Sequence, residues 1–158
     1  MATKQIQQPK KRSSFKTDMP LWMLAGLALL AMPRAVIHDL DGLPFDSPAY
    51  IAMAVAPLLL YLAIAIFRNN KRPMYDFIVL GLFFGVFLSL VHLILWDHKW
   101  GGNPPAFGDQ LTGVFCPEVE DMLFRISVTF SGLHVGIALG ALFGAIGLIA
   151  QKVRARRV

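Results

Sequence analysis

Cysteine and charge are both scarce in this sequence. Cys116 is the one cysteine among 158 residues, which excludes an intrachain disulfide, a CxxC redox pair and a cysteine zinc site. Charged residues make up 16% of the chain and apolar residues 56%, so a small soluble domain would have too few polar side chains to cover its surface. The composition therefore indicates a membrane protein of one domain.

The motifs of the commonest enzymes are absent as well. The sequence has no Walker loop, dinucleotide fingerprint, HExxH, GxSxG elbow or EF-hand loop. Its net charge of +5 is compatible with nucleic-acid binding, but the basic residues stand in short runs beside apolar segments rather than on one amphipathic surface. We therefore expect no nucleic-acid partner, and a non-enzymatic protein rather than an enzyme.

Long apolar runs are what the sequence has in abundance, at residues 20–37, 49–67, 74–96 and 123–150. Each approaches or exceeds the ~20 residues that a helix needs to cross about 30 Å of hydrocarbon. Helices are required because lipid cannot hydrogen-bond an exposed backbone, and the alternation typical of membrane barrel strands is missing. We predict an all-α, integral membrane four-helix bundle over residues 20–150, between basic tails at 1–19 and 151–158.

Capping residues and prolines mark where these helices begin. We expect Asp18 to cap the first helix and Ser47 the second. Prolines suited to the first helical turn are Pro20, Pro48, Pro73 and Pro117. Acidic residues follow the last of these prolines, so the fourth helix is expected to begin outside the hydrocarbon.

Charge alternates between the connecting segments. Twelve of the fifteen basic residues lie in the two tails and the link after the second run, namely Lys4, Lys10, Lys11, Arg12, Lys16, Arg68, Lys71, Arg72, Lys152, Arg154, Arg156 and Arg157. Eight of the ten acids lie in the other two connections and the start of the fourth helix, namely Asp39, Asp41, Asp46, Asp97, Asp109, Glu118, Glu120 and Asp121. Because basic segments stay cytoplasmic, we predict both termini inside a cell membrane.

The first run has a second interpretation, as a cleaved signal peptide. The basic leader before it is long for a signal peptide, however. Met32, Pro33 and Arg34 stand where a small-residue cleavage site would lie. We therefore expect an uncleaved first span.

Glycines recur at intervals of four in the fourth run, at Gly132, Gly136, Gly140 and Gly144, and a shorter series in the third run comprises Gly81, Gly85 and Ser89. Steps of four residues drift by only about 40° around a helix, so each series forms one slanting groove. Such grooves let a neighbouring backbone approach closely in lipid. We predict a helix-packing role, either between these two spans or with a second copy of the chain.

Polar residues gather near the predicted outer ends of the spans. The candidate cluster comprises Arg34, His38, Asp39, His92, Asp97, His98 and Arg125. His92 falls about 20° from Gly81 on a helical wheel, so antiparallel packing would bring it near Arg125 or Thr129. The simpler interpretation is that His92 makes an interhelical hydrogen bond, the arginines reach lipid headgroups, and Asp39 and Asp97 are solvated.

Cofactor sites are poorly supported by spacing. His92 and His134 differ in depth and face, which argues against a shared haem, and we expect a neutral His134 bonded to a neighbouring helix near Pro57. A metal site would have to combine residues from two loops without recognisable ligand spacing, namely His38, Asp39, Asp41, Asp97 and His98. We expect neither haem nor metal, and we interpret Asp76 only as an acid favoured by its helix dipole.

Three functions remain open from the sequence. The first is an accessory subunit that packs through its glycine faces, in a homo-oligomer or a larger membrane complex. The second is a component of a transporter for a small anion or protons, with an outward-facing polar vestibule, and the third is a membrane enzyme built on the outer cluster. In each case we expect the lipid bilayer as partner, with anionic headgroups at the basic tails.

Overall fold

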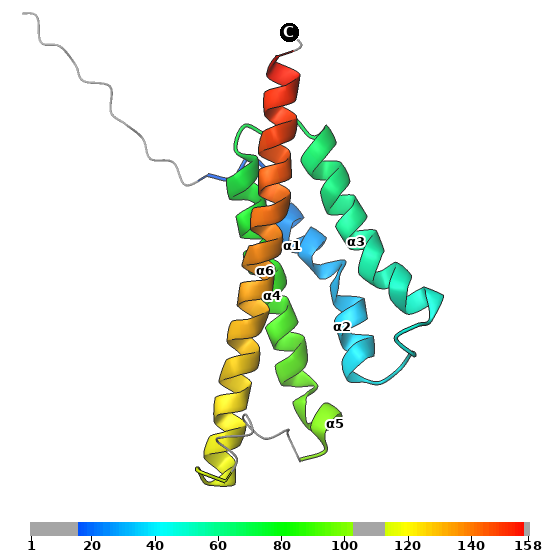
Figure 1. The fold of residues 1–158 in the computed structure, drawn as a ribbon, viewed down its shortest axis with the longest axis vertical. Helices are drawn as coiled ribbons and strands as arrows, with labels where there is room; N and C mark the ends of the chain where they lie inside the picture. Colours follow the sequence, from blue (N-terminus) through cyan, green and yellow to red (C-terminus); the bar gives the residue numbers. More distant parts are fainter. Residues whose placement is uncertain (1–15, 103–112, 157–158) are drawn as a thin grey trace, which may run out of the picture.

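The computed structural model describes residues 16–102 and 113–156, and its elements in these ranges are all helices. They are α1 (Leu21–Leu29), α2 (Met32–Asp39), α3 (Pro48–Phe67), α4 (Pro73–Ile94), α5 (Trp96–Trp100) and α6 (Pro117–Ala155), as Figure 1 shows. Four helical segments are long and apolar enough to cross a membrane: 21–39, 48–67, 73–94 and 117–155. The all-α class and the four apolar segments are thus confirmed. Large apolar side chains such as Trp22 and Phe67 are exposed, as lipid-facing residues would be.

The first span is broken in the middle, where α1 gives way to α2. Pro33 has no N–H to donate to the Leu29 carbonyl, and its ring crowds that carbonyl. Beside the break, the Tyr61 hydroxyl from α3 donates to the Leu27 carbonyl at 2.7 Å. The broken span therefore follows from one proline, and a buried tyrosine supplies an extra donor there.

Three of the predicted helix starts are confirmed and one is wrong. The Ser47 hydroxyl accepts from the Tyr50 N–H at 3.3 Å, and Pro73 and Pro117 are the first residues of α4 and α6. Asp18 does not cap α1, whose N-cap residue makes no side-chain hydrogen bond.

Asp18 instead binds the two residues that precede α4. Its carboxylate accepts from the backbone N–H groups of Lys71 at 2.5 Å and Arg72 at 3.0 Å. Its own N–H donates to Asp76 at 2.9 Å, so the segment before α1 folds against the start of α4. Asp76 is completely buried there, and the interpretation of Asp76 as a helix-dipole acid and nothing more is wrong.

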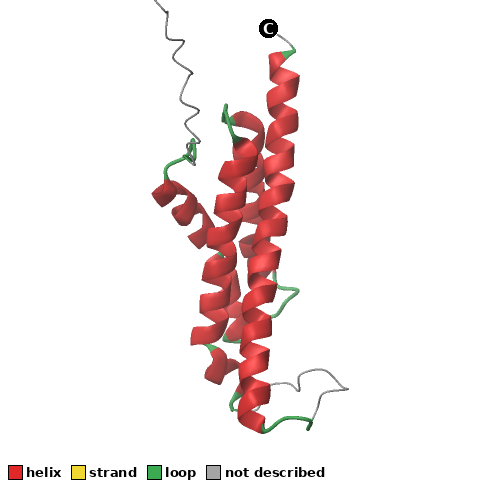
Figure 2. Cartoon of the chain, turned by 90° about the vertical axis from the view of Figure 1, so that its left-hand side faces the viewer, coloured by secondary structure: helices red, strands yellow, loops and turns green. Residues whose placement is uncertain are grey.

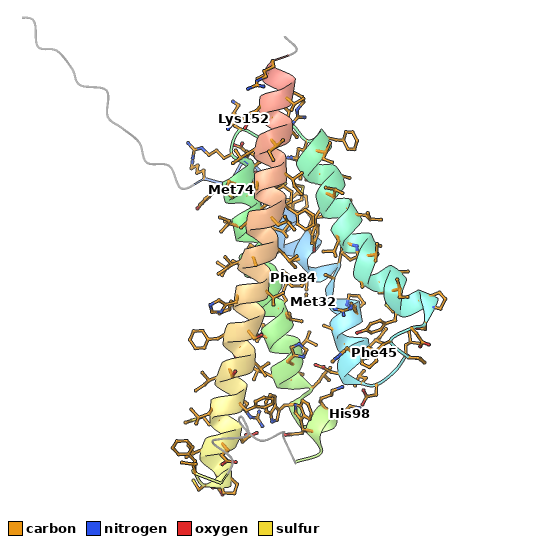
Figure 3. The ribbon with its side chains drawn as sticks, viewed as in Figure 1. Met32, Phe45, Met74, Phe84, His98 and Lys152 are labelled. Carbon is orange, nitrogen blue, oxygen red and sulfur yellow. The ribbon has the colours of Figure 1, made fainter. Side chains whose placement is uncertain are left out.

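The C-terminal basic run also makes a contact that its sequence did not reveal. Arg154 of α6 donates to the carbonyls of Phe67 at 3.2 Å and Arg68 at 3.0 Å. These carbonyls end α3, where a helix leaves acceptors without intrahelical partners. Arg154 therefore caps a neighbouring helix, whereas Lys152, labelled at the same end of the molecule in Figure 3, is exposed.

The two glycine series face each other within one chain, along the line where α4 and α6 run side by side (Figures 1 and 2). A Cβ built on Gly85 would lie 2.8 Å from the Gly132 carbonyl oxygen, and one built on Gly136 would lie 2.7 Å from the Gly85 nitrogen. Cβ atoms on Gly81 and Gly140 would meet backbone oxygens of the opposite helix even more closely. A side chain at any of these positions would push the helices apart.

Aromatic packing joins α3 to this helix pair. The rings of Tyr61 and Phe77 lie 5.8 Å and 6.1 Å from that of Phe143, between ring centroids. All three side chains are buried, together with Met19 and Leu24 from the N-terminal side. The core therefore lies between α1, α3, α4 and α6, in the half of the molecule where the α3–α4 link is found.

Gly136→Ala is expected to lower the stability of the protein by roughly 1–3 kcal/mol, because the new methyl group overpacks the α4–α6 contact. Gly26→Ala is the matched control, since a Cβ there meets nothing within 4 Å. Unfolding followed by circular dichroism in detergent should show a lower Tm for Gly136→Ala and an unchanged or slightly higher Tm for Gly26→Ala, because alanine favours a helix more than glycine does. Equal responses of the two variants would contradict the packing role.

Candidate functional site

A buried carboxylate links two histidines near one end of the molecule. Asp39, the last residue of α2, is only 2% exposed. One of its oxygens lies 2.9 Å from Nδ1 of His38, and the other lies 2.5 Å from Nδ1 of His92 on α4. The expectation that Asp39 is solvated is therefore wrong, because the end of α2 packs against α4 rather than projecting into solvent.

The carboxylate fixes which ring nitrogens remain available for other partners. An ionised carboxylate only accepts hydrogen bonds, so Nδ1 of each imidazole must donate to Asp39. In a neutral imidazole the other nitrogen, Nε2, is then an acceptor, and in an imidazolium it is a donor. Within the described residues, Asp39 is the only hydrogen-bond partner of the rings of His38 and His92. Both Nε2 atoms can therefore serve a ligand.

These side chains line a cavity of about 270 Å³. Its walls come from α2, α4, α5 and α6. The polar lining is contributed by His38, Asp39, His92 and Lys99, with Ser131 on α6. Trp96 and Trp100, at the two ends of α5, line the same space. The size is close to the lower limit of small-ligand pockets, roughly 300 Å³.

Lys99, like Ser131, is a polar member of this cavity that the sequence did not reveal. Its ammonium group donates to the His38 carbonyl at 3.1 Å and to Asp41 at 3.0 Å. Asp41 adopts a left-handed backbone conformation with φ of 48°, which aspartate tolerates better than most residues. The position of Lys99 between Trp96 and Trp100 was the signal that could have identified it. Asp97 and His98 were predicted from the same segment instead.

Arg125 and Asp97 form a separate group instead of joining the cavity. Arg125 donates to Asp121 at 2.8 Å, and its guanidinium lies 4.6 Å from the centre of the Trp96 ring. Asp97 is 3.7 Å from that guanidinium, with its side chain 93% exposed. Trp96 also donates to Asp121 at 2.9 Å, which ties α5 to the start of α6.

Arg34 and His98 also lie apart from the cavity. The Arg34 guanidinium lies 5.1 Å from the centre of the Tyr50 ring, and His98, labelled in Figure 3, is exposed. His92 makes no hydrogen bond to Arg125 or Thr129: it bonds to Asp39, and the Thr129 hydroxyl bonds to a carbonyl of its own helix. In the described parts of the chain, no three histidine, cysteine or acidic side chains are grouped to hold a metal ion.

His134 also differs from its predicted position. It is exposed, and its Nδ1 lies 2.7 Å from the Phe130 carbonyl of the same helix. The expected bond to a neighbouring helix near Pro57 is wrong, because α6 turns its glycine face toward α4 and His134 lies on the other side. An imidazole that satisfies itself within its own helix gives no evidence of a site.

His92→Ala is expected to lower stability by roughly 1–3 kcal/mol, because a buried oxygen of Asp39 loses its hydrogen-bond donor. The matched control is His134→Ala, which removes an exposed imidazole that bonds only within its helix. Thermal unfolding of the two variants in the same detergent should separate them clearly. If both variants unfold like the parent protein, the Asp39 contact does not hold α2 on α4.

Comparison with known protein families, with curated proteins and with solved structures finds no match. What the chain does must therefore be inferred from its own geometry. Four apolar helices are compatible with a small membrane protein.

Proposed function

We propose that the chain is a multi-pass membrane protein that binds a small weak acid, or its anion, in the cavity beside Asp39. The observation that carries this proposal is the pair of imidazoles, held by one buried carboxylate, at the wall of a cavity that also contains Lys99. This is the vestibule that the sequence suggested, with a different set of residues. A transporter would use it as its outer entrance.

A weak acid suits this site because an imidazole can share one proton with it in either protonation state. A neutral imidazole accepts the proton of an undissociated acid at Nε2, and an imidazolium donates its Nε2 proton to the corresponding anion. Both routes end in the same hydrogen-bonded pair of imidazole, proton and anion. The ammonium group of Lys99 is already paired with Asp41 at 3.0 Å, so the positive charge that would favour the anion is that of an imidazolium.

An accessory role through the glycine faces has less support than this. The glycines of α6 contact α4 of the same chain, so that groove is filled and does not offer a free surface to a partner. An oligomer or a larger complex would have to form through other faces. The cavity beside Asp39, in contrast, is left open by the internal packing.

For the orientation we propose that both termini lie in the cytoplasm and that the protein resides in a cell membrane. The alternation of basic and acidic segments supports this, and it puts the cavity at the outer side. Lys152 and Arg156 are exposed at the opposite end, where they would meet anionic headgroups at about 1 kcal/mol per basic residue. Arg157 lies outside the described residues.

Topology can be tested with the native cysteine, because Cys116 is exposed at the start of α6. A membrane-impermeant maleimide should label it in intact cells. In a Cys116→Ser background, Asp46→Cys should also be labelled, whereas Lys71→Cys should react only after permeabilisation. Labelling of Lys71→Cys in intact cells, without labelling of Asp46→Cys, would reverse the proposed orientation.

Ligand binding can be tested by nitrogen NMR of histidine in the nanodisc-embedded protein. Addition of acetate should shift the Nε2 resonances of His38 and His92 and leave those of His98 and His134 unchanged. Chloride at the same ionic strength is the control for a general salt effect. Asp39→Asn should weaken acetate binding about tenfold, because one imidazole loses its acceptor, a loss of roughly 1.4 kcal/mol. Equal shifts of all four histidines, or none, would refute the site.

A further inference from the structure

We propose that the natural ligand is an amphipathic weak acid, with an acidic head and a short hydrocarbon chain. This inference rests on the proposed function and adds the chemical class of the ligand. It comes from the way in which polar and apolar side chains divide the cavity lining.

Most of the polar lining lies at or near helix ends, whereas Ser131 lies within α6, between Val128 and Val135. His38 is the next-to-last residue of α2, and Lys99 lies on α5, after the end of α4. His92 lies in the last turn of α4. An acidic head would therefore bind at the level where the helices emerge from the hydrocarbon.

The apolar part of the lining lies deeper along α4 and α6. Leu88 is four residues before His92 on α4, and Val135 is seven residues beyond Val128 on α6. At 1.5 Å per residue these separations amount to roughly 6 Å and 10 Å along the helices. The lining of the cavity therefore extends from its polar end along a mostly apolar wall, in which Val135 is 45% exposed.

A purely polar ligand would leave the apolar walls in contact with water. A hydrocarbon chain would cover Leu88, Val128 and Val135, and each methylene that it buries should tighten binding about fourfold. An apolar molecule without a head would leave both Nε2 atoms unsatisfied. Only a molecule with both parts uses the whole lining.

A second cavity shows by contrast why the head matters. About 390 Å³ lie between the broken first span and α3, lined by Leu30, Pro33, Ala52, Met53, Ala56, Pro57 and Leu60. This cavity is larger, yet no polar side chain lines it. It offers nothing that would distinguish one hydrocarbon from another, so we assign the ligand to the cavity beside Asp39.

The test uses tryptophan fluorescence of the Trp22→Phe protein in nanodiscs, in which Trp96 and Trp100 of the cavity remain. The probes are acetate, octanoate and octanol, with free concentrations corrected by partitioning into empty nanodiscs. Octanoate is expected to bind at least tenfold more tightly than either acetate or octanol. The acid head and the chain are thus tested separately.

A variant of the apolar wall provides the structural control. Val135→Phe fills the deep end of the cavity, so it should weaken octanoate binding about tenfold and leave acetate binding unchanged. Ile137→Phe adds bulk at an equally exposed position of the same helix, 45% for both residues, that does not line the cavity, and it should change neither.

Three other outcomes would each contradict the ligand class, the recognition of an acid, or the proposed function. If acetate and octanoate bind equally well, the amphipathic class is wrong and the acid site stands. If octanol binds as tightly as octanoate, recognition of an acid is wrong and the proposed function fails with it. If neither acid binds, the proposed function itself is wrong.

Discussion

Backbone meets backbone where α4 packs along α6, because Gly85 on one helix and Gly132 and Gly136 on the other leave no side chain between them. In lipid there is no hydrophobic driving force for such a contact, so dispersion over the closely approaching backbones must supply it. The other elements are arranged around this pair. α1 and α2 pack against α4, and α3 packs against α6.

The candidate site depends on the same contact. Ser89, which contacts both Gly85 and Thr129, lies one turn before His92 on α4. The close approach of α4 and α6 at Ser89 determines the distance between these two helices at the level of the cavity. Asp39 then attaches α2 to His92 across that opening. A few ångströms more between α4 and α6 would change the cavity that we assign to the ligand.

Much of the fold follows from one-dimensional patterns, because length and hydropathy decide what can cross a bilayer. The four apolar segments were predictable for that reason. The Ser47 cap and the prolines that open α4 and α6 were predictable because capping and the missing proline N–H depend only on local sequence. The site was only partly predictable. His38, Asp39 and His92 were expected to lie at one level, but depth along a span does not say which faces meet.

The two ends of the first span are each fixed to a different end of α4. Asp18 binds the start of α4, through residues 53 and 54 positions later, and Asp39 binds His92, also 53 positions later. During synthesis the first span is therefore complete long before its partners exist. The two ends of the first span can therefore be fixed only after α4 has been made, because both of its carboxylates bind at residues beside or within α4.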